Sequence, residues 1–520
     1  MNKEFNITGK CIPSLHYMVD TSAKLKAITT DYIDKGRYFV INRGRQFGKT
    51  TTLSLLTQAL DDTCLMLNVS FEGSEALFES FVSFAEGLRG IIYKELKTKR
   101  SRFAGIFSKC PFAPLSFMDL EDRIQKLCQK SKKPVVLLID EVDKASNYEV
   151  FSSFLGKLRD MYLKRDEQAT FKSVILAGVH DIKNLKKKIR PESEHTTNSP
   201  WNIATDFTLD MSFHPDEIKT MLAQYEEDHH TGMDMDAVSE RIYFWTFGYP
   251  FLVSDICKII EETPLAWDSN GVDEAAKYLL AKPNLLFDDM VKNLDMFPEL
   301  NSMTRSIVLE GASVPESNTD QIINIGKMYG IYRADENRKI IIANRIFQNT
   351  LLDYYSTKEE IKGIISRYLC EESQFIQNGI LDMETVLKKF SIFMKSEYRD
   401  QDSGFIEREG RLLFLSFLRP IINGKGNYAV ESETRGSKRM DIIVFYGGKE
   451  YLVELKIWRG ESYEASGMQQ LADYVKGRSG DKAYLLSYAN LQKSPRQGGW
   501  QTIDGINIYE EIVAYKDKML

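Results

Sequence analysis

The sequence predicts an α/β protein that is built from several domains. Short β-branched runs alternate with amphipathic helical stretches up to about residue 210, which is the pattern of a parallel sheet with crossover helices. One of these runs leads directly into a glycine-containing turn and a helix. After a mostly helical middle region, the last block alternates strands and helices again, which indicates a separate α/β domain. At 520 residues the chain is too long for one hydrophobic core.

The composition is that of an ordinary globular protein, with 43% hydrophobic and 27% charged residues. We expect a cytoplasmic protein with no membrane partner, because no apolar run reaches the roughly 20 residues that cross a bilayer and no signal peptide is visible. The six cysteines are scattered, which favours buried reduced thiols over a zinc site or disulfides. A net charge of −6 excludes a generally basic nucleic-acid binder, but a local basic groove stays open.

The first domain is expected to contain a parallel sheet of five strands. These strands are Tyr38–Asn42, Cys64–Phe71, Pro134–Asp140, Ser173–Val179 and Asp206–Asp210. The following region is mostly helical up to about residue 290, with helices at His214–Asp228 and Tyr249–Glu262. Residues 291–355 then show two helices and a strand–turn–strand pattern around Asp335, which indicates a winged helix.

The last block follows a charged helical segment, Lys358–Asp400. It begins with an expected helix at Ile406–Leu418. The strands expected after it are Tyr428–Glu433, Asp441–Phe445, Glu450–Lys456 and Ala483–Leu486. Their alternation with helical segments predicts a second α/β sheet.

A phosphate-binding loop follows the first strand. Gly48-Lys49-Thr50 opens a helix, whose backbone N–H groups and dipole favour a bound phosphate. Lys49 would neutralise the β- and γ-phosphates of ATP, and the Thr50 hydroxyl would bind Mg²⁺. The residues expected around the nucleotide are Gly44, Gln46, Phe47, Gly48, Lys49, Thr50 and Thr51. The usual motif has a glycine five residues before Gly48, where this chain has Arg43.

A second motif, which is acidic, completes the expected magnesium site. The apolar strand that starts at Pro134 ends in Asp140-Glu141. Asp140 would hold the metal through water or Thr50, and Glu141 would polarise the attacking water. A core strand with a solvated acidic end would look the same in isolation, but the upstream loop favours the catalytic interpretation. Asp143 is expected to cap the next turn.

The third central strand leads into polar and basic residues. His180 and Asp181 are candidates to contact the γ-phosphate, although a histidine at a loop end is more often only solvated. The run from Lys183 to Arg190 is expected to be a solvated face, with a nucleic-acid contact or a catalytic cation as the alternatives. Arg43, Arg45 and Arg190 are candidate cations for a neighbouring subunit, and a homo-oligomer stays open.

Most of the segment from residue 5 to residue 355 resembles the bacterial AAA-ATPase-like family, whose members are similar to STAND-type and archaeal P-loop ATPases. The matching segments are His16–Asp20, Arg43–Thr50, Asp140–Asp143, Ser199–Phe207 and Thr246–Val253. This family characteristically replaces the first glycine of the loop, so Arg43 fits it. The resemblance implies a three-layer αβα domain with the added central strand of ASCE ATPases, then a helical lid and a winged helix. It also implies that Pro250 lies near the nucleotide base, although proline at a helix start explains this residue equally well.

Two carboxylates and a lysine stand out in the last block. Asp441 opens one expected strand, and Glu454 and Lys456 lie two apart on the next, so these two share a face. Carboxylates on adjacent strands can bind one divalent cation, and Lys456 could orient a water or stabilise a phosphorane-like transition state. An amphipathic hairpin with a salt-bridged outer face is the plainer alternative.

This pattern resembles the PD-(D/E)xK nuclease superfamily, and in particular the nuclease-like domain that follows the ATPase in the same AAA-ATPase-like family. The resemblance implies a metal-binding glutamate on the preceding helix, at Glu409 or Glu407. It also implies a role for Gln470 in the Gln470–Tyr474 motif. The expected domains are a P-loop AAA-like ATPase domain (1–215), a helical lid (216–290), a winged helix (291–357), a helical linker (358–395) and a nuclease-like domain (396–520).

Together these patterns predict an ATP- and Mg²⁺-binding ATPase coupled to a metal-dependent nuclease domain that acts on DNA or RNA. One alternative is a nucleotide-dependent interaction switch whose nuclease fold binds without cleaving. Another is an ATP-binding regulator that hydrolyses slowly and has no nucleic-acid partner.

Overall fold

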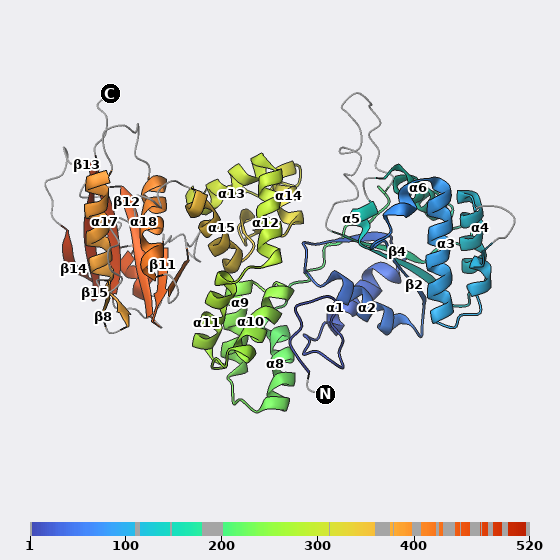
Figure 1. Ribbon diagram of the computed structural model, residues 1–520, viewed down its shortest axis with the longest axis horizontal. Coiled ribbons are helices and arrows are strands. Elements are labelled where there is room, and N and C mark those ends of the chain that lie inside the picture. Colours follow the sequence, from blue (N-terminus) through green and yellow to red (C-terminus); the bar gives the residue numbers. More distant parts are fainter. Residues whose placement is uncertain are drawn as a thin grey trace, which may run out of the picture. The chain divides into compact units, whose positions relative to one another are not determined.

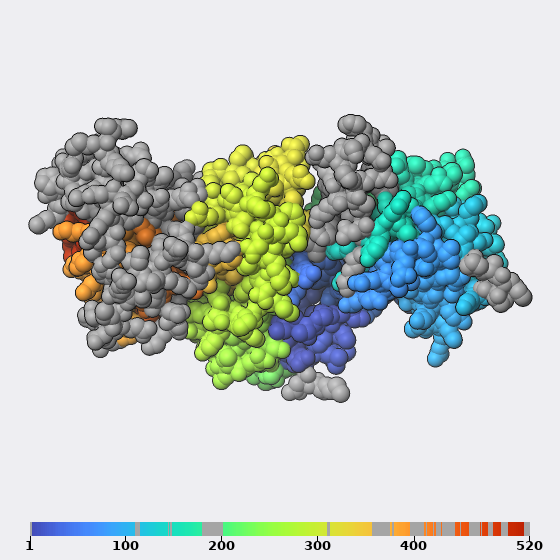
Figure 2. Space-filling view, turned by 45° about the horizontal axis from the view of Figure 1, so that its top comes forward, coloured from blue at the N-terminus to red at the C-terminus, as the bar shows by residue number. Residues whose placement is uncertain are grey.

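The computed structural model describes most of the chain, in two compact units. The described residues, coloured in Figure 2, are 3–109, 115–145, 148–178, 201–310, 312–358, 375–377, 379–397, 407–422, 426–429, 442–447, 449–457, 468–469, 471–476, 482–490 and 498–515. The first unit comprises Met1–Tyr243, Gly248–Lys258 and Met328–Gly330, and the second comprises Phe244–Phe247, Ile259–Lys327 and Ile331–Leu520. Within the described part, no helix combines the length and the apolar character that crossing a membrane requires.

The first unit contains a four-stranded parallel sheet with the order β1-β4-β3-β2. Two of its strands, β2 and β4, are labelled in Figure 1. The strands are β1 (Phe39–Asn42), β2 (Leu65–Ser70), β3 (Val135–Asp140) and β4 (Ser173–Gly178). Strand β4 therefore lies between β1 and β3, as the resemblance to ASCE ATPases implies. This order brings the loop after β1 and the acidic end of β3 to the same edge of the sheet, because the strands are parallel.

The prediction of a fifth strand at Asp206–Asp210 is wrong. A single parallel bridge joins Phe39 to Thr205, and no ladder follows it among the described residues. The reason is a competing hydrogen bond from a side chain. The hydroxyl of Tyr32 donates to the carbonyl of Asp206 at 3.3 Å and accepts from the N–H of Thr208 at 3.2 Å, so these backbone groups pair with Tyr32 and not with β1.

Helices cover both faces of this sheet, which confirms the three-layer arrangement. On one face lie α3 (Phe81–Thr98), α4 (Phe117–Lys130) and α6 (Glu149–Leu163), and on the other lie α1 (Ser22–Ile28), a short π-helix (Thr29–Ile33) and α2 (Lys49–Leu60). Shorter helical turns are η2 (Glu75–Phe78), η3 (Ala104–Phe107) and α5 (Val142–Ala145). All of the residues from Val135 to Ile139 are buried, because β3 has a packed layer on each side.

The middle of the chain is helical, as the sequence predicts. Its helices are α8 (Pro215–His229), α9 (Met235–Thr246), α10 (Pro250–Glu262), α11 (Ser269–Ala281), α12 (Leu285–Met296), α13 (Pro298–Glu310), α14 (Gln321–Met328) and α15 (Arg345–Lys358). A small sheet with the order β5-β7-β6 contains β5 (Val314–Pro315), β6 (Tyr332–Ala334) and β7 (Lys339–Ile342). The antiparallel pairing of β6 with β7 confirms the predicted hairpin.

The C-terminal part is built around a six-stranded mixed sheet with the order β10-β11-β12-β13-β15-β14. Its strands are β10 (Gly426–Ala429), β11 (Ile442–Tyr446), β12 (Lys449–Ile457), β13 (Lys482–Asn490), β14 (Gly499–Ile503) and β15 (Ile506–Tyr515). Two further short strands, β8 (Ile376–Gln377) and β9 (Ile380–Leu381), pair with each other. The sequence interpretation missed β8, β9, β14 and β15.

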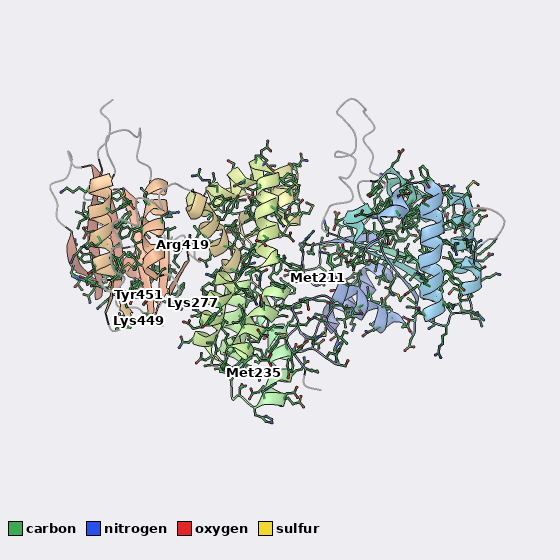
Figure 3. The ribbon with its side chains drawn as sticks, in the orientation of Figure 1. Met211, Met235, Lys277, Arg419, Lys449 and Tyr451 are labelled. Carbon is green, nitrogen blue, oxygen red and sulfur yellow. The ribbon has the colours of Figure 1, made fainter. Side chains whose placement is uncertain are left out.

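Two helices pack on one face of this mixed sheet, α17 (Met383–Glu397) and α18 (Glu407–Ile422). The hydroxyl of Ser391 in α17 donates to the carbonyl of Ile512 in β15 at 3.0 Å. The segment expected to be a linker therefore contains a helix that packs on the C-terminal sheet. In the same unit, Arg419 of α18 forms an ion pair with Asp353 of α15. Tyr451 of β12 is buried. Figure 3 labels Arg419 and Tyr451.

Candidate functional site

The loop between β1 and α2 has the geometry of an anion cradle. Gln46 and Gly48 have φ values of 56° and 76°, so the chain turns through the left-handed region twice within three residues. Such turns direct consecutive backbone N–H groups to one concave side, where they can bind an anion. Helix α2 begins at Lys49, so its N-terminal N–H groups and dipole add to the same site.

Lys49 is held across this loop by two backbone carbonyl groups. Its Nζ donates to the carbonyl oxygens of Arg43 and Gly44, at 2.8 Å in each case. An ammonium group has three N–H donors, so these two bonds fix its position and the third donor can serve a phosphate oxygen. Burial lowers the pKa of Lys49, and the negative charges of Asp143, Asp140 and Glu141 act in the opposite direction. A bound phosphate would add to the charges that keep the ammonium protonated.

Arg43 contributes to the loop through its backbone, while its side chain points elsewhere. Its guanidinium donates to the carbonyls of Asn42 and Leu209, both at 2.9 Å, and lies 5.5 Å from the ring centre of Phe207. Burial lowers the pKa of Arg43, and the charge of Asp210 partly offsets this effect. The arginine at this motif position therefore anchors the segment around residue 207.

The acidic end of β3 lies beside the loop. The Thr50 hydroxyl donates to Oδ2 of Asp140 at 2.7 Å, and the N–H of Glu141 donates to Oδ1 of the same residue at 2.9 Å. Glu141 has a φ of 57°, a conformation that costs a non-glycine residue on the order of 1 kcal/mol and is concentrated at functional sites. Thr50 is exposed and Asp140 is half-buried. These hydroxyl and carboxylate oxygens suit Mg²⁺, which binds few protein ligands and keeps several waters.

The end of β4 packs tightly against this acidic turn. Gly178 accepts a hydrogen bond from the N–H of Arg43 at 3.2 Å. A Cβ atom added to Gly178 would lie 2.6 Å from Cγ2 of Val142 and 2.9 Å from Oδ1 of Asp143. The predicted γ-phosphate candidates that follow, His180 and Asp181, lie outside the described residues, as does the run from Lys183 to Arg190.

We therefore expect Gly178→Ala to destabilise the first unit and to displace the acidic turn. The added methyl group overpacks the contact with Val142 and Asp143, which typically costs about 1–3 kcal/mol. Urea denaturation would measure the free energy of unfolding. Gly156→Ala in α6 is the matched control, because its Cβ meets nothing within 4 Å and a helical Gly→Ala change stabilises by about 1 kcal/mol. Equal effects of the two substitutions would contradict this packing argument.

On the other side of the loop, the start of α10 lies against Gly48. The Cβ of Pro250 would be 3.9 Å from a Cβ placed on Gly48. Gly248, with a φ of 71°, has no space for a side chain, because its Cβ would lie 2.1 Å from the carbonyl oxygen of Phe213. The Thr51 hydroxyl accepts a hydrogen bond from the N–H of Cys11 at 3.1 Å, so the N-terminal segment contacts the first turn of α2.

Tyr249, which precedes α10, contacts the loop between β1 and α2, and sequence reasoning missed this residue. Its hydroxyl donates to the carbonyl of Arg45, and its ring meets that of Phe47 edge-on at a centroid distance of 4.8 Å. Burial raises the pKa of Tyr249, so the phenol stays protonated and available as a donor. The sequence did contain a signal for this contact. Tyr249 lies next to Pro250, which was expected near the nucleotide, so Tyr249 had to lie close to the phosphate loop as well.

In the C-terminal sheet, Glu454 and Lys456 share a face of β12, as predicted. The Oε1 of Glu454 lies 3.7 Å from Nζ of Lys456, and the two side chains are 13% and 18% exposed. Strand β11 begins directly after Asp441, and its first residue, Ile442, pairs with Val453, the residue before Glu454. Asp441 itself and Gln470 lie outside the described residues.

Ser487 and Glu510 extend this polar cluster, and sequence reasoning missed both. Ser487 pairs with Lys456 across β12 and β13, and its hydroxyl donates to Oε1 of Glu510 at 2.6 Å. Glu510 is only 1% exposed. A buried carboxylate is costly unless hydrogen bonds and nearby cations compensate it. The strand register places Lys456 on the same face, next to Ser487, where its positive charge can compensate the carboxylate of Glu510.

The helix that carries Glu409 lies across the sheet from this cluster. The hydroxyl of Tyr488 donates to the carbonyl of Gly410 in α18 at 2.7 Å. Adjacent strand residues point to opposite faces, so α18 lies on the face opposite to Ser487 and Lys456. The Glu409 side chain is outside the described residues. The described part of the chain contains no group of three or more His, Cys, Asp or Glu placed to bind a metal.

Comparisons with known proteins find structural likeness only. No family model and no curated protein matches the chain. The Walker-type ATPase of Pyrococcus abyssi superposes with a TM-score of 0.46 at 12% identity, over 67% of this chain and 99% of that one. The Aeropyrum pernix ORC2 protein gives 0.36 at 12% identity, over 67% and 98% of the two chains. The Thermotoga maritima RuvB Holliday junction branch migration motor gives 0.33 at 12% identity, over 65% and 96%. None of these likenesses is strong enough to assign the chain to a family.

Proposed function

We propose that the first unit is a magnesium-dependent ATPase. The observation that carries this proposal is the convergence of Lys49, fixed by two loop carbonyls, with Thr50, which is hydrogen-bonded to Asp140. The parallel sheet order brings these residues from two different strands to one edge. A cationic donor, a hydroxyl and a carboxylate are the groups that a triphosphate–Mg²⁺ complex requires.

The proposed reaction is hydrolysis of the γ-phosphate. The loop N–H groups and Lys49 would bind the β- and γ-phosphate oxygens, while Thr50 and Asp140 would hold Mg²⁺. Glu141 would orient a water and accept its proton as the oxygen bonds to the γ-phosphorus. The bond to the bridging oxygen would break, which leaves ADP and inorganic phosphate. Pro250, beside Gly48, is the proposed contact of the base.

We also propose that the C-terminal sheet is a metal-dependent nuclease domain that the nucleotide state regulates. Support comes from the largely buried pair of Glu454 and Lys456 on one face of β12. The proposal requires Asp441 to lie opposite Glu454, so that two carboxylates share a divalent cation. Lys456 would then stabilise the charge that develops on the attacked phosphodiester. DNA or RNA is the proposed substrate, and the proposed setting is the cytoplasm.

Glu454→Ala is expected to abolish cleavage while nucleic-acid binding persists, because the substitution removes a metal ligand and leaves the rest of the face in place. We expect a loss of about 10²–10³-fold in rate, the usual effect of removing one preorganised electrostatic group. The assay incubates purified protein with DNA or RNA, with Mg²⁺ or Mn²⁺, and with or without ATP. Glu450→Ala, an exposed glutamate on the same strand, is the control and should cleave normally.

A nucleotide-dependent binding switch is the second candidate. It is favoured by the distance of 3.7 Å between Glu454 and Lys456, because a carboxylate that pairs with a lysine on its own strand can form a salt-bridged binding face without a metal. Tight binding with no cleavage in any metal would support the switch and exclude the nuclease.

A further inference from the structure

A segment far from the phosphate loop in sequence contacts it directly. Met328–Gly330, which runs from the last residue of α14 toward β6, belongs to the same compact unit as the loop. A Cβ added to Gly44 would lie 3.0 Å from the carbonyl oxygen of Tyr329. A Cβ added to Gly330 would lie 3.8 Å from the Cα of Gly44. Two glycines therefore allow two backbones to touch, which is a common use of glycine at a close approach.

Tyr249 ties this contact to the rest of the loop. Its hydroxyl would lie 3.3 Å from a Cβ on Gly44 and donates to the carbonyl of Arg45, and its ring packs on Phe47. The same ring would lie 3.6 Å from a Cβ on Gly330. Tyr249 is thus a shared support for the loop and for the Met328–Gly330 segment. Because packed groups of this kind cannot deform continuously, a shift in the loop must also displace the segment.

The Tyr329 phenol is influenced by charges of the proposed site. It is half-buried, and its pKa is raised first by burial and then by the negative charge of Asp143, while Arg45 opposes the shift. Asp143 and Arg45 also act on the pKa of Lys49, together with Asp140 and Glu141. Tyr329 and Lys49 therefore share part of their electrostatic surroundings.

We propose that Met328–Gly330 is a latch on the nucleotide site, in which the Tyr329 backbone presses on Gly44 and its ring covers the phosphate side. The ligand class is a nucleoside triphosphate with Mg²⁺, so this inference rests on the proposed ATPase function. A nucleotide that enters or leaves must pass the Tyr329 ring. Occupancy of the loop and the position of the segment are then coupled, and the coupling acts in both directions.

The first test measures nucleotide exchange by stopped flow with a fluorescent ATP analogue and Mg²⁺. Tyr329→Ala should raise both the association and the dissociation rate by at least about fivefold, which corresponds to a barrier that is about 1 kcal/mol lower. A merely structural role would weaken binding through stability without accelerating association. Tyr278→Ala, which removes an exposed tyrosine from α11, is the matched control and should leave both rates unchanged. Rates of Tyr329→Ala that equal those of the wild type would overturn the latch.

The second test needs no substitution and therefore does not depend on the folding of a variant. Hydrogen exchange of the wild-type chain is compared with and without a non-hydrolysable ATP analogue and Mg²⁺. Exchange in peptides that cover Met328–Gly330 should change by at least about fivefold, together with that of the loop. A change in the loop with none at Met328–Gly330 would refute the latch and leave the ATPase proposal standing. No nucleotide binding by the wild type would refute both.

Discussion

Lys49→Ala is expected to remove ATP turnover and to weaken ATP binding strongly. The ammonium group is fixed by the carbonyls of Arg43 and Gly44 at 2.8 Å, so it contributes its charge without reorganising when the phosphates arrive. Removing one preorganised electrostatic group of this kind typically costs about 10²–10³-fold in rate. Phosphate release under saturating ATP measures turnover, and a fluorescent analogue measures the dissociation constant.

The control for this substitution is Lys35→Ala. Lys35 lies on the surface of the same unit, with a half-exposed side chain paired to Asp31, and such exposed pairs contribute little to stability. Its loss should leave turnover and binding unchanged. If Lys49→Ala retained wild-type affinity, the loop would not be the phosphate site, whatever its backbone geometry.

Glu141→Gln is expected to separate binding from hydrolysis. The amide keeps the size of the side chain, and the N–H of Glu141 still donates to Asp140, so the magnesium side of the site is preserved. The substitution removes the proton acceptor, and loss of a general base typically costs about 10²–10⁴-fold in rate. Turnover should therefore fall steeply while the dissociation constant of the analogue stays near that of the wild type.

A matched control for this second substitution is Glu149→Gln, in the first turn of α6. It makes the same chemical change on a neighbouring helix and should not alter turnover. A Glu141→Gln variant that hydrolyses ATP at the wild-type rate would show that another group activates the water. Asp143, which stands beside Gly178 and contributes to the charge around Lys49, would then be the next candidate.

The geometry of the proposed nucleotide site could be predicted from the sequence because local patterns determine it. An apolar strand that ends in two acids and a glycine-containing turn before a helix are each written in consecutive residues, and Thr50 and Asp140 indeed meet. What could not be predicted depends on side chains from distant segments. The Tyr32 hydroxyl takes the backbone groups of Asp206 and Thr208 away from a fifth strand, and nothing within that segment indicates it.

In the C-terminal sheet, too, a contact with a distant segment could not be predicted from the local sequence pattern. Strand β15 was missed because Glu510 and Glu511 interrupt its apolar pattern, which suggests a solvated segment. In the fold, Glu510 is buried and paired with Ser487 on β13. A buried carboxylate of this kind breaks the local rule for strands, and such exceptions concentrate where a protein has a functional or strained site.

Position 43, the first residue of the phosphate loop, matters for the sequence patterns that are used to detect such loops. Lys49 donates its hydrogen bond at position 43 to the backbone carbonyl oxygen, which every amino acid supplies. The side chain at that position leaves the loop and reaches Leu209, so its identity is selected by a different part of the fold. Pattern searches that demand glycine there would therefore discard loops of this geometry. A pattern that scores Gly48, Lys49 and Thr50 and ignores the fifth residue before Gly48 would retain them.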